Sequence, residues 1–378
     1  MKIASAEARC YRVPLPAPWG SATHRITHHE LIVTRIAADS KLDGVGWSYT
    51  VGAGGTAAAA FLSDYLLPGL VGRDPAPVEQ IWDRLWRETH DVGGGIARLA
   101  LASLDIALWD LRAKAAGQPL CALLGGARAP VPAYGSGVNL HLPLPELLAQ
   151  VERWQRRGYQ AFKIKVGDDD PERDVERVRA VRAKIGPGAR LMVDANQKWT
   201  AAEAVGRVAM LEPFGLHWVE EPVLADDVPG NAWVKAQVRT PVALGENVHS
   251  RYQFAEYLRQ SAVDIVQPDV ARVGGVTEWL KIAHLAQAHH LPVSAHLVVE
   301  ISCHLHCAVT NTTVLEDVDG GSLTELGVLR SPIQAEQGRI MPPAASGHGV
   351  EVSWEALRRF EVVPGVAAGA AAAPRERV

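Results

Sequence analysis

The stretch AFKIKV at residues 161–166 is a short apolar run with two lysines at alternate positions, and its pattern recurs along the chain. Later apolar runs of similar length each end in an acidic or imidazole side chain. A stretch with helical periodicity lies between one run and the next. The runs are LMVD (191–194), LHWVE (216–220), PVALGE (241–246), VDIVQPD (263–269), LPVSAH (291–296) and TTVLE (312–316). Repeated strand–helix units predict a parallel sheet, and VPAY at 131–134 supplies an eighth strand, so we expect a TIM-type barrel.

The first 125 residues follow a different pattern. Strands are predicted at 30–38 and 45–49, joined by a hairpin turn at 41–44, and helices at 56–67, 78–90 and 96–116 with Gly117 as a C-cap. Strands followed by helices without alternation indicate an α+β unit. Near the end of the chain a strand is expected at 350–353, and residues 365–378 are expected to fray.

Composition narrows the class of protein. The chain has 378 residues, a net charge of −4 and a pI near 6.4, so it lacks the strong positive field that draws nucleic acid or anionic membranes. No apolar run approaches the ~20 residues that cross a membrane, and no secretory signal is recognisable at the start. Four scattered cysteines are too few for a disulfide framework, which favours a cytoplasmic protein.

The chemistry is expected at the ends of the predicted barrel strands. A TIM barrel gathers these ends on one face, where active sites lie. From Lys165 onward, successive strand-end residues are separated by steps of 29, 26, 26, 23, 27 and 20 residues, about one strand–helix unit each. The side chains expected to converge are Lys163, Lys165, Asp194, Glu220, Glu246, Asp269, His296 and Glu316.

Asp194, Glu220 and Glu246 are the predicted metal ligands. Three converging carboxylates repel one another unless a cation binds between them, and oxygen ligands without a nearby cysteine favour Mg²⁺ or Mn²⁺ over zinc. The alternative is that each acid only caps the helix that follows. That alternative suits one isolated acid better than three acids at near-equal steps.

Lys163 and Lys165 are predicted to share one face of a strand, about 6.6 Å apart along it. Two neighbouring ammonium groups beside a cation are expected to have lowered pKa values, and a lysine tuned toward neutrality can act as a general base. The alternative is an exposed edge strand with lysines reaching into solvent. The apolar residues that flank them favour a buried strand.

Asp269, His296 and Glu316 complete the predicted catalytic set. A carboxylate bonded to one imidazole nitrogen fixes the tautomer and raises the basicity of the other, so His296 is expected to act as a second acid or base opposite Lys165. Glu316, if protonated, would donate a hydrogen bond as negative charge builds on a substrate oxygen. Together these groups suit removal of the proton next to a carboxylate, through an enediolate held by magnesium.

At these residues the chain resembles the enolase superfamily, in its mandelate racemase subgroup. The matching motifs are Lys163-Ile164-Lys165, Asp194-Ala195-Asn196, Glu220-Glu221-Pro222, Gly245-Glu246-Asn247, Asp269, His296 and Glu316. The resemblance implies a (β/α)₇β barrel at about 126–346 and an α+β capping domain at 1–125, on which the segment at about 347–378 folds back. It also implies bound Mg²⁺, a homo-oligomer, a small carboxylate substrate, and a specificity lid at 19–29.

Two reactions within the subgroup fit the sequence. The region from Ser294 to Glu316 resembles mandelate racemases, whereas residues 44–49, 53–55, 142–144 and 267–275 resemble talarate/galactarate dehydratases. We favour dehydration of an acid sugar (an aldarate or aldonate) to a 2-keto-3-deoxy acid, with a racemase or epimerase of a 2-hydroxy acid as the alternative. A polyhydroxy acid needs a polar pocket, which is expected from the lid and the loop at 48–55. The residues expected to bind substrate are Asn196, Ser136, His24, Arg25 and Tyr49.

Two other interpretations are less favoured. A barrel that has lost catalysis and only binds a ligand should lack a lysine, the His–Asp pair or a metal ligand, and all are present. The sequence CHLHC at 303–307 looks like a soft-metal cluster, but its place just after a barrel strand predicts core packing.

Overall fold

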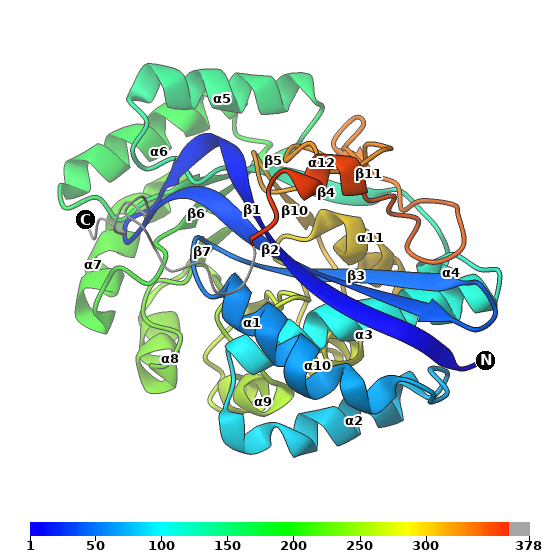
Figure 1. Cartoon of the computed structure of the whole chain (residues 1–378). Helices are drawn as coiled ribbons and strands as arrows, with labels where there is room; N and C mark the ends of the chain where they lie inside the picture. Colours follow the sequence, from blue (N-terminus) through cyan, green and yellow to red (C-terminus); the bar gives the residue numbers. More distant parts are fainter. Residues whose placement is uncertain (363–378) are drawn as a thin grey trace, which may run out of the picture.

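A computed structural model of the chain describes residues 1–362; the segment predicted to fray, 365–378, lies outside them. An antiparallel three-stranded sheet crosses the front of a parallel barrel in Figure 1, with α1 and α3 packed against that sheet and α2 packed against α3. The sheet is ordered β1 (Ile3–Gly20), β2 (Arg25–Ala38), β3 (Asp43–Thr50). Its helices are α1 (Gly55–Phe61), continued by a π-helical turn at Leu62–Leu66, α2 (Val78–Glu88) and α3 (Ile96–Ala115). The short α4 (Leu120–Leu123) leads to the barrel.

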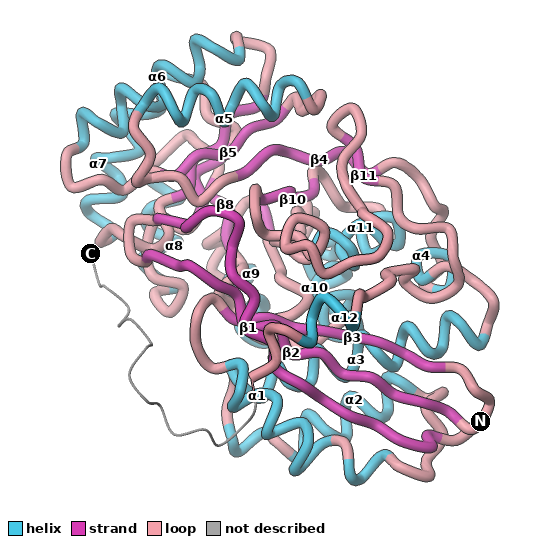
Figure 2. Tube along the Cα trace, turned by 45° about the horizontal axis from the view of Figure 1, so that its top comes forward, coloured by secondary structure: helices cyan, strands magenta, loops and turns pink. Residues whose placement is uncertain are grey.

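The barrel has the predicted (β/α)₇β order. Its strands are β4 (Val131–Ser136), β5 (Ala161–Lys165), β6 (Arg190–Asp194), β7 (Trp218–Glu220), β8 (Val242–Leu244), β9 (Ile265–Val266) and β10 (Leu315–Val318). The helices between them are α5 (Leu144–Arg156), α6 (Pro171–Ile185), α7 (Ala201–Leu211), α8 (Val228–Gln237), α9 (Arg251–Arg259), α10 (Val276–Ala288) and α11 (Val299–Ala308). Figure 2 shows these helices around the magenta strands.

One predicted barrel strand is reduced to single bridges. The run at 291–296 joins its neighbours through parallel bridges Val266↔Val293, Asp269↔His296 and Val293↔Thr312. Because β10 in turn pairs with β4, these bridges close the ring. The predicted strand at 350–353 is likewise a single bridge, Leu329↔Val352.

The longest strand, β1, was not predicted. It is an edge strand that carries three prolines (Pro14, Pro16 and Pro18), which lack the N–H a central strand would need. Other local predictions are confirmed: Thr200 and Glu203 form a capping box at α7, and Gly117 ends α3 with a positive φ of 65°.

The sheet lies close to α3 because two glycines of β3, Gly44 and Gly46, face that helix. A Cβ on Gly46 would lie 2.2 Å from the carbonyl oxygen of Ser103, so no larger residue fits there without movement. Asp105 of α3 accepts a hydrogen bond from the amide of Thr277. Trp82 of α2 donates its indole N–H to the carbonyl oxygen of Gly274. These bonds join the N-terminal unit to the start of α10 in the barrel.

The last described segment contacts the N-terminal unit. His348 donates its Nε2 hydrogen to the carbonyl oxygen of Val45, and the amide of Val362 donates to Cys10. A small β11 (Arg339–Ile340) pairs with β4, and α12 (Trp354–Arg358) lies near β1. We propose the domain division at about residue 125 on this arrangement. No helix within residues 1–362 is long and apolar enough to cross a membrane.

Candidate active site

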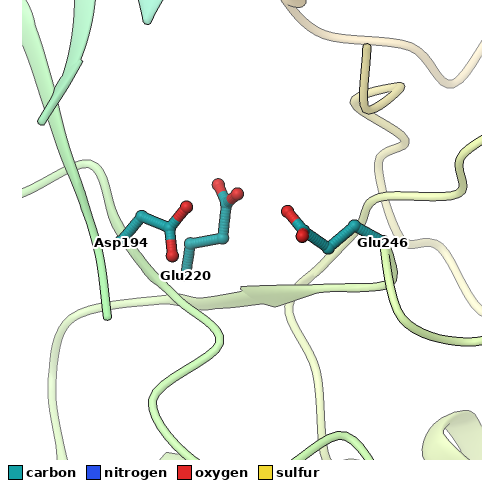
Figure 3. Close-up of side chains that lie close together, drawn as sticks. All are labelled: Asp194, Glu220 and Glu246. Atoms are coloured by element: carbon teal, nitrogen blue, oxygen red, sulfur yellow. The ribbon is translucent and has the colours of Figure 1, made fainter. Parts of the chain in front are cut away.

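Three carboxylates meet at the carboxyl ends of β6, β7 and β8. Oxygens of Asp194, Glu220 and Glu246 lie within 4.8 Å of one another, and all three side chains are buried. Figure 3 shows the carboxyl group of Glu246 facing that of Glu220, with Asp194 beside Glu220. Burial raises the pKa of Glu220 to about 7, and the charges of Asp194, Glu316 and Glu246 add to the rise, although Lys163 opposes it.

This set of donors fits a hard divalent cation. All three ligand atoms are carboxylate oxygens, and no other group of three or more His, Cys, Asp or Glu side chains in the described part of the chain is close enough to hold an ion. The CHLHC stretch is therefore not a metal cluster. Asp194, Glu220 and Glu246 are the residues that would hold Mg²⁺.

The two lysines lie beside this triad. Lys163 Nζ contacts Glu220 and lies 2.7 Å from Glu316 Oε1, while Lys165 Nζ contacts Asp194. Both pKa values are above the ordinary value: burial lowers them, but Glu220 and Glu316 raise that of Lys163 more, and Asp194 raises that of Lys165 more. The lowering expected beside a bound cation stays a prediction, because in these contacts the carboxylates pair with the lysines and outweigh burial.

Asp269 and His296 form the predicted pair. Nδ1 of His296 lies 2.7 Å from Oδ2 of Asp269, and Nε2 lies 3.0 Å from Glu246 Oε2. Burial lowers the pKa of His296, but Glu246 and the bond to Asp269 raise it to about 10. The ring is therefore oriented by Asp269 on one side, and its other nitrogen faces Glu246.

Glu316 accepts hydrogen bonds rather than donating one. Its Oε1 receives the hydroxyl of Ser136 at 2.8 Å as well as Lys163. Burial raises the pKa of Glu316, but Lys163 and His296 lower it below its ordinary value. In these contacts Glu316 is a carboxylate, so the protonated form expected as a donor is not the one this environment favours.

Three further groups bond to the acidic residues of the site, and spacing alone did not assign them. Gln267 Nε2 donates to Glu220 Oε2 at 2.8 Å. Asn247 Nδ2 donates to both carboxyl oxygens of Glu221, at 2.9 and 3.0 Å. Arg272 donates to the Glu246 carbonyl oxygen at 3.0 Å. All of them stand in the quoted motifs, but their partners come from neighbouring strands, which a linear pattern does not reveal.

Unusual backbone conformations also gather here. Nine non-glycine residues within 1–362 have a positive φ; four of them, Asn196, Gln197, Glu221 and Leu297, line the pocket of this site, and a fifth, Val298, follows Leu297. Val298 is β-branched, so its φ of 46° is especially unfavourable. Such strain is typical of functional sites, because the surrounding structure must hold it in place.

A pocket of about 140 Å³ lies over these groups. Of the residues expected to bind substrate, Ser136, Asn196 and His24 line it. Arg25 instead lines a neighbouring groove of about 890 Å³. Tyr49 is buried below the pocket and donates its hydroxyl to Asp269 Oδ2 at 2.5 Å. The structure thus brings together the predicted catalytic and metal residues, but not Arg25 and Tyr49 as parts of the pocket wall.

Both parts of the chain match known family models. Residues 5–125 match the family model described as mandelate racemase / muconate lactonizing enzyme, N-terminal domain, and residues 146–356 match the enolase C-terminal domain-like model. The chain is 38% identical to a 3,6-anhydro-alpha-L-galactonate cycloisomerase of Streptomyces coelicolor, over 93% of this chain and 97% of that protein. It is also 38% identical to an L-talarate/galactarate dehydratase of Salmonella typhimurium, over 75% of this chain and 71% of that protein.

A solved structure is similar along almost the whole chain. It is a racemase from Streptomyces coelicolor A3(2) with bound magnesium, 37% identical, with a TM-score of 0.92. The similarity covers 95% of this chain and all of that one.

Proposed function

The chain belongs to the mandelate racemase / muconate lactonizing enzyme family of the enolase superfamily, and from that premise we propose that it acts on an acid sugar. In the proposed reaction the proton α to the carboxylate is removed and the oxygen substituent on the β-carbon is expelled. The product is a 2-keto-3-deoxy acid. The relatives include dehydratases, cycloisomerases and racemases, all of which fit an initial loss of the α-proton.

We propose that Mg²⁺ (or Mn²⁺) binds Asp194, Glu220 and Glu246, where it would supply positive charge for the substrate carboxylate. The charge of Lys163, at the bottom of the same site, adds to that of the ion. Binding of a cation would also take over the carboxylates that Lys165 and His296 now contact. Both side chains would then be free to face the substrate.

Lys165 and His296 are the proposed base and acid. Lys165 Nζ takes the α-proton, and the electron pair of the broken C–H bond forms the enediolate. As that pair moves to the bond between the α- and β-carbons, the β-carbon–oxygen bond breaks, and His296 gives its proton to the departing oxygen. The resulting enol becomes the 2-keto acid by moving one proton from oxygen to carbon. If the departing oxygen is a hydroxyl, water leaves; if it is a ring ether, the ring opens and nothing is lost.

The observation that carries this proposal is that the three carboxylates, both lysines and the His296–Asp269 pair line one buried site. The test incubates the Mg²⁺-loaded enzyme with a panel of aldonates, aldarates and an anhydro-aldonate, and detects 2-keto-3-deoxy products with semicarbazide. Formation of such a product from any of them supports the proposal. The racemase takes its place if every acid sugar is inert while a simple 2-hydroxy acid loses optical activity.

A further inference from the structure

The pocket over the carboxylates is polar on one side and apolar on the other. The polar side is formed by residues that follow β5 to β9, among them Lys165, Asn196, Glu221, Glu246 and Arg272. The remaining wall carries six apolar side chains: Trp19, Ile26, Val51, Val138, Leu297 and Val318. The polar lining that we predicted from residues 19–29 for a polyhydroxy acid is therefore only partly present, because these six side chains have no group aimed at hydrogen bonding with a substrate hydroxyl.

The apolar side chains come from neighbouring elements, so they form one surface. Val318 is paired with Ser136 across β10 and β4, and Val138 lies in the loop two residues beyond the end of β4. Trp19 is opposite Ile26 in the β1–β2 hairpin, and the amide of Gly20 donates to the carbonyl oxygen of Val138. The hairpin therefore places its two apolar side chains beside those of the barrel.

Trp19 and Val138 line both this pocket and the larger groove that contains Arg25, so the two cavities are neighbours. Its Nε1 donates to the Asp319 carbonyl oxygen at 3.0 Å, and its ring packs edge-on against His29 with centroids 4.8 Å apart. The indole is thus held from two sides. Arg25 lines the groove and is not among the residues that line the pocket.

The polar groups of the hairpin end lie at the margin of the pocket. The Ser21 hydroxyl accepts the amides of His24 and Thr23, so its lone pairs are used within the turn. His24 is exposed, and its Nδ1 lies 2.8 Å from the Thr23 hydroxyl. Apart from the imidazole of His24, the basic side chains that line the pocket (Lys165, Arg272 and His296) all belong to the catalytic side.

From this wall we infer that the substrate is a monocarboxylic acid whose far end is uncharged and compact, such as a ring ether or an aryl ring, and not an open-chain dicarboxylate. The inference rests on the proposed function in one respect, that the substrate carboxylate lies at the acidic triad. A second carboxylate would then face mainly apolar side chains, with only Ser21 and His24 as polar groups at the pocket margin, and burying a charge with few partners is costly. The volume of about 140 Å³ is also close to that of cavities that hold a single benzene ring, so little room remains for an extended chain.

Calorimetry on the Mg²⁺-loaded enzyme with mandelate, 3,6-anhydro-L-galactonate and galactarate tests this inference. At least one compact monoacid should bind about tenfold or more tightly than galactarate, and the two monoacids distinguish an aryl from a ring-ether far end. Equal or tighter binding of galactarate overturns the inference, as does the absence of measurable binding by all three.

A variant adds a second, independent arm. Ile26→Arg places a cation in the apolar wall and should raise galactarate affinity relative to mandelate by about tenfold, whereas Ile26→Leu should keep the wild-type ranking. An unchanged ranking in a folded Ile26→Arg protein would contradict the assigned wall. Because these are binding measurements, their outcome is separate from that of the product assay. The affinity ranking of the three acids can hold while no 2-keto-3-deoxy acid forms, and such a product can form while the ranking fails.

Discussion

The hydroxyl of Tyr49, on β3 of the N-terminal sheet, donates to the same Asp269 oxygen that contacts Nδ1 of His296. The distances are 2.5 Å from Tyr49 Oη and 2.7 Å from His296 Nδ1. The other Asp269 oxygen accepts the amides of Ala271 and Arg272. The carboxylate is therefore fixed by donors from two parts of the chain, and Tyr49 joins the N-terminal unit to the catalytic pair although it does not itself line the pocket.

Tyr49→Phe should lower kcat about tenfold with little change in KM, because the ring remains while one bond to the Asp269 carboxylate is lost. Steady-state kinetics on any substrate found above would measure it. Mg²⁺ affinity should stay at the wild-type value, and Tyr252→Phe, at an exposed tyrosine, is the control. A fall in Mg²⁺ affinity equal to the fall in kcat would indicate general disruption instead.

Glu220→Gln should weaken Mg²⁺ binding at least about tenfold, since it removes one charged oxygen ligand while preserving shape. Titration calorimetry with Mg²⁺ gives the affinity directly. The matched control is Glu176→Gln, at an exposed acid on α6, which should bind as wild type. If amide variants of Asp194, Glu220 and Glu246 all keep wild-type affinity, these residues are not the ligands.

Much of the site could be predicted because each strand contributes its last side chain to the same face of the barrel. Spacing alone therefore assembled Asp194, Glu220 and Glu246 into one group. Tyr49 could not be placed in this way, because its contact with Asp269 joins residues 220 positions apart in different units. The sequence predicted Tyr49 as a substrate-binding residue, but it did not reveal that the side chain is buried outside the pocket lining and bonds to Asp269.

The pocket wall was harder to predict for a related reason. Residues 19–29 carry several polar side chains, but they form the end of a hairpin, where alternate residues point to opposite sides. Trp19, Ser21, His24 and Ile26 line the pocket, whereas Arg25 lines the outer groove. Which face is inward depends on the register of β1 with β2, and the long β1 was not recognised.

Glu300→Gln should change how stability depends on pH. Glu300 is buried, and burial together with the charge of Asp317 raises its pKa to about 7, although backbone donors oppose the rise. The folded protein thus holds this proton more tightly than the unfolded chain does. Its contribution to stability is full below the unfolded pKa and is lost as pH rises from about 4.5 to 7.

Urea unfolding at pH 5 and pH 8 would measure this dependence. From pH 5 to pH 8 the wild type should lose a few kcal/mol of its free energy of unfolding that Glu300→Gln keeps, because an amide does not ionise. Glu336→Gln, at an exposed acid, should track the wild type at both. The same pH dependence in wild type and Glu300→Gln would show that Glu300 ionises normally in the folded protein.

Gly46→Ala should lower the free energy of unfolding by about 2 kcal/mol or more, since the added Cβ would lie 2.2 Å from a backbone oxygen of α3. At Gly188 a Cβ would meet nothing within 4 Å, so Gly188→Ala should stay within about 0.5 kcal/mol of wild type. Equal stability of the two variants in urea unfolding would contradict the close packing of β3 on α3.

The most direct test of the account is exchange of the α-hydrogen with deuterated water, followed by NMR on the Mg²⁺-loaded enzyme with each enantiomer of a bound 2-hydroxy acid. Lys165→Ala should abolish exchange from one enantiomer, and His296→Asn should abolish it from the other. Each variant should keep exchange of the enantiomer that presents its hydrogen to the remaining group. Full exchange of both enantiomers by both variants would contradict the assignment of Lys165 and His296 as the groups that move the α-proton.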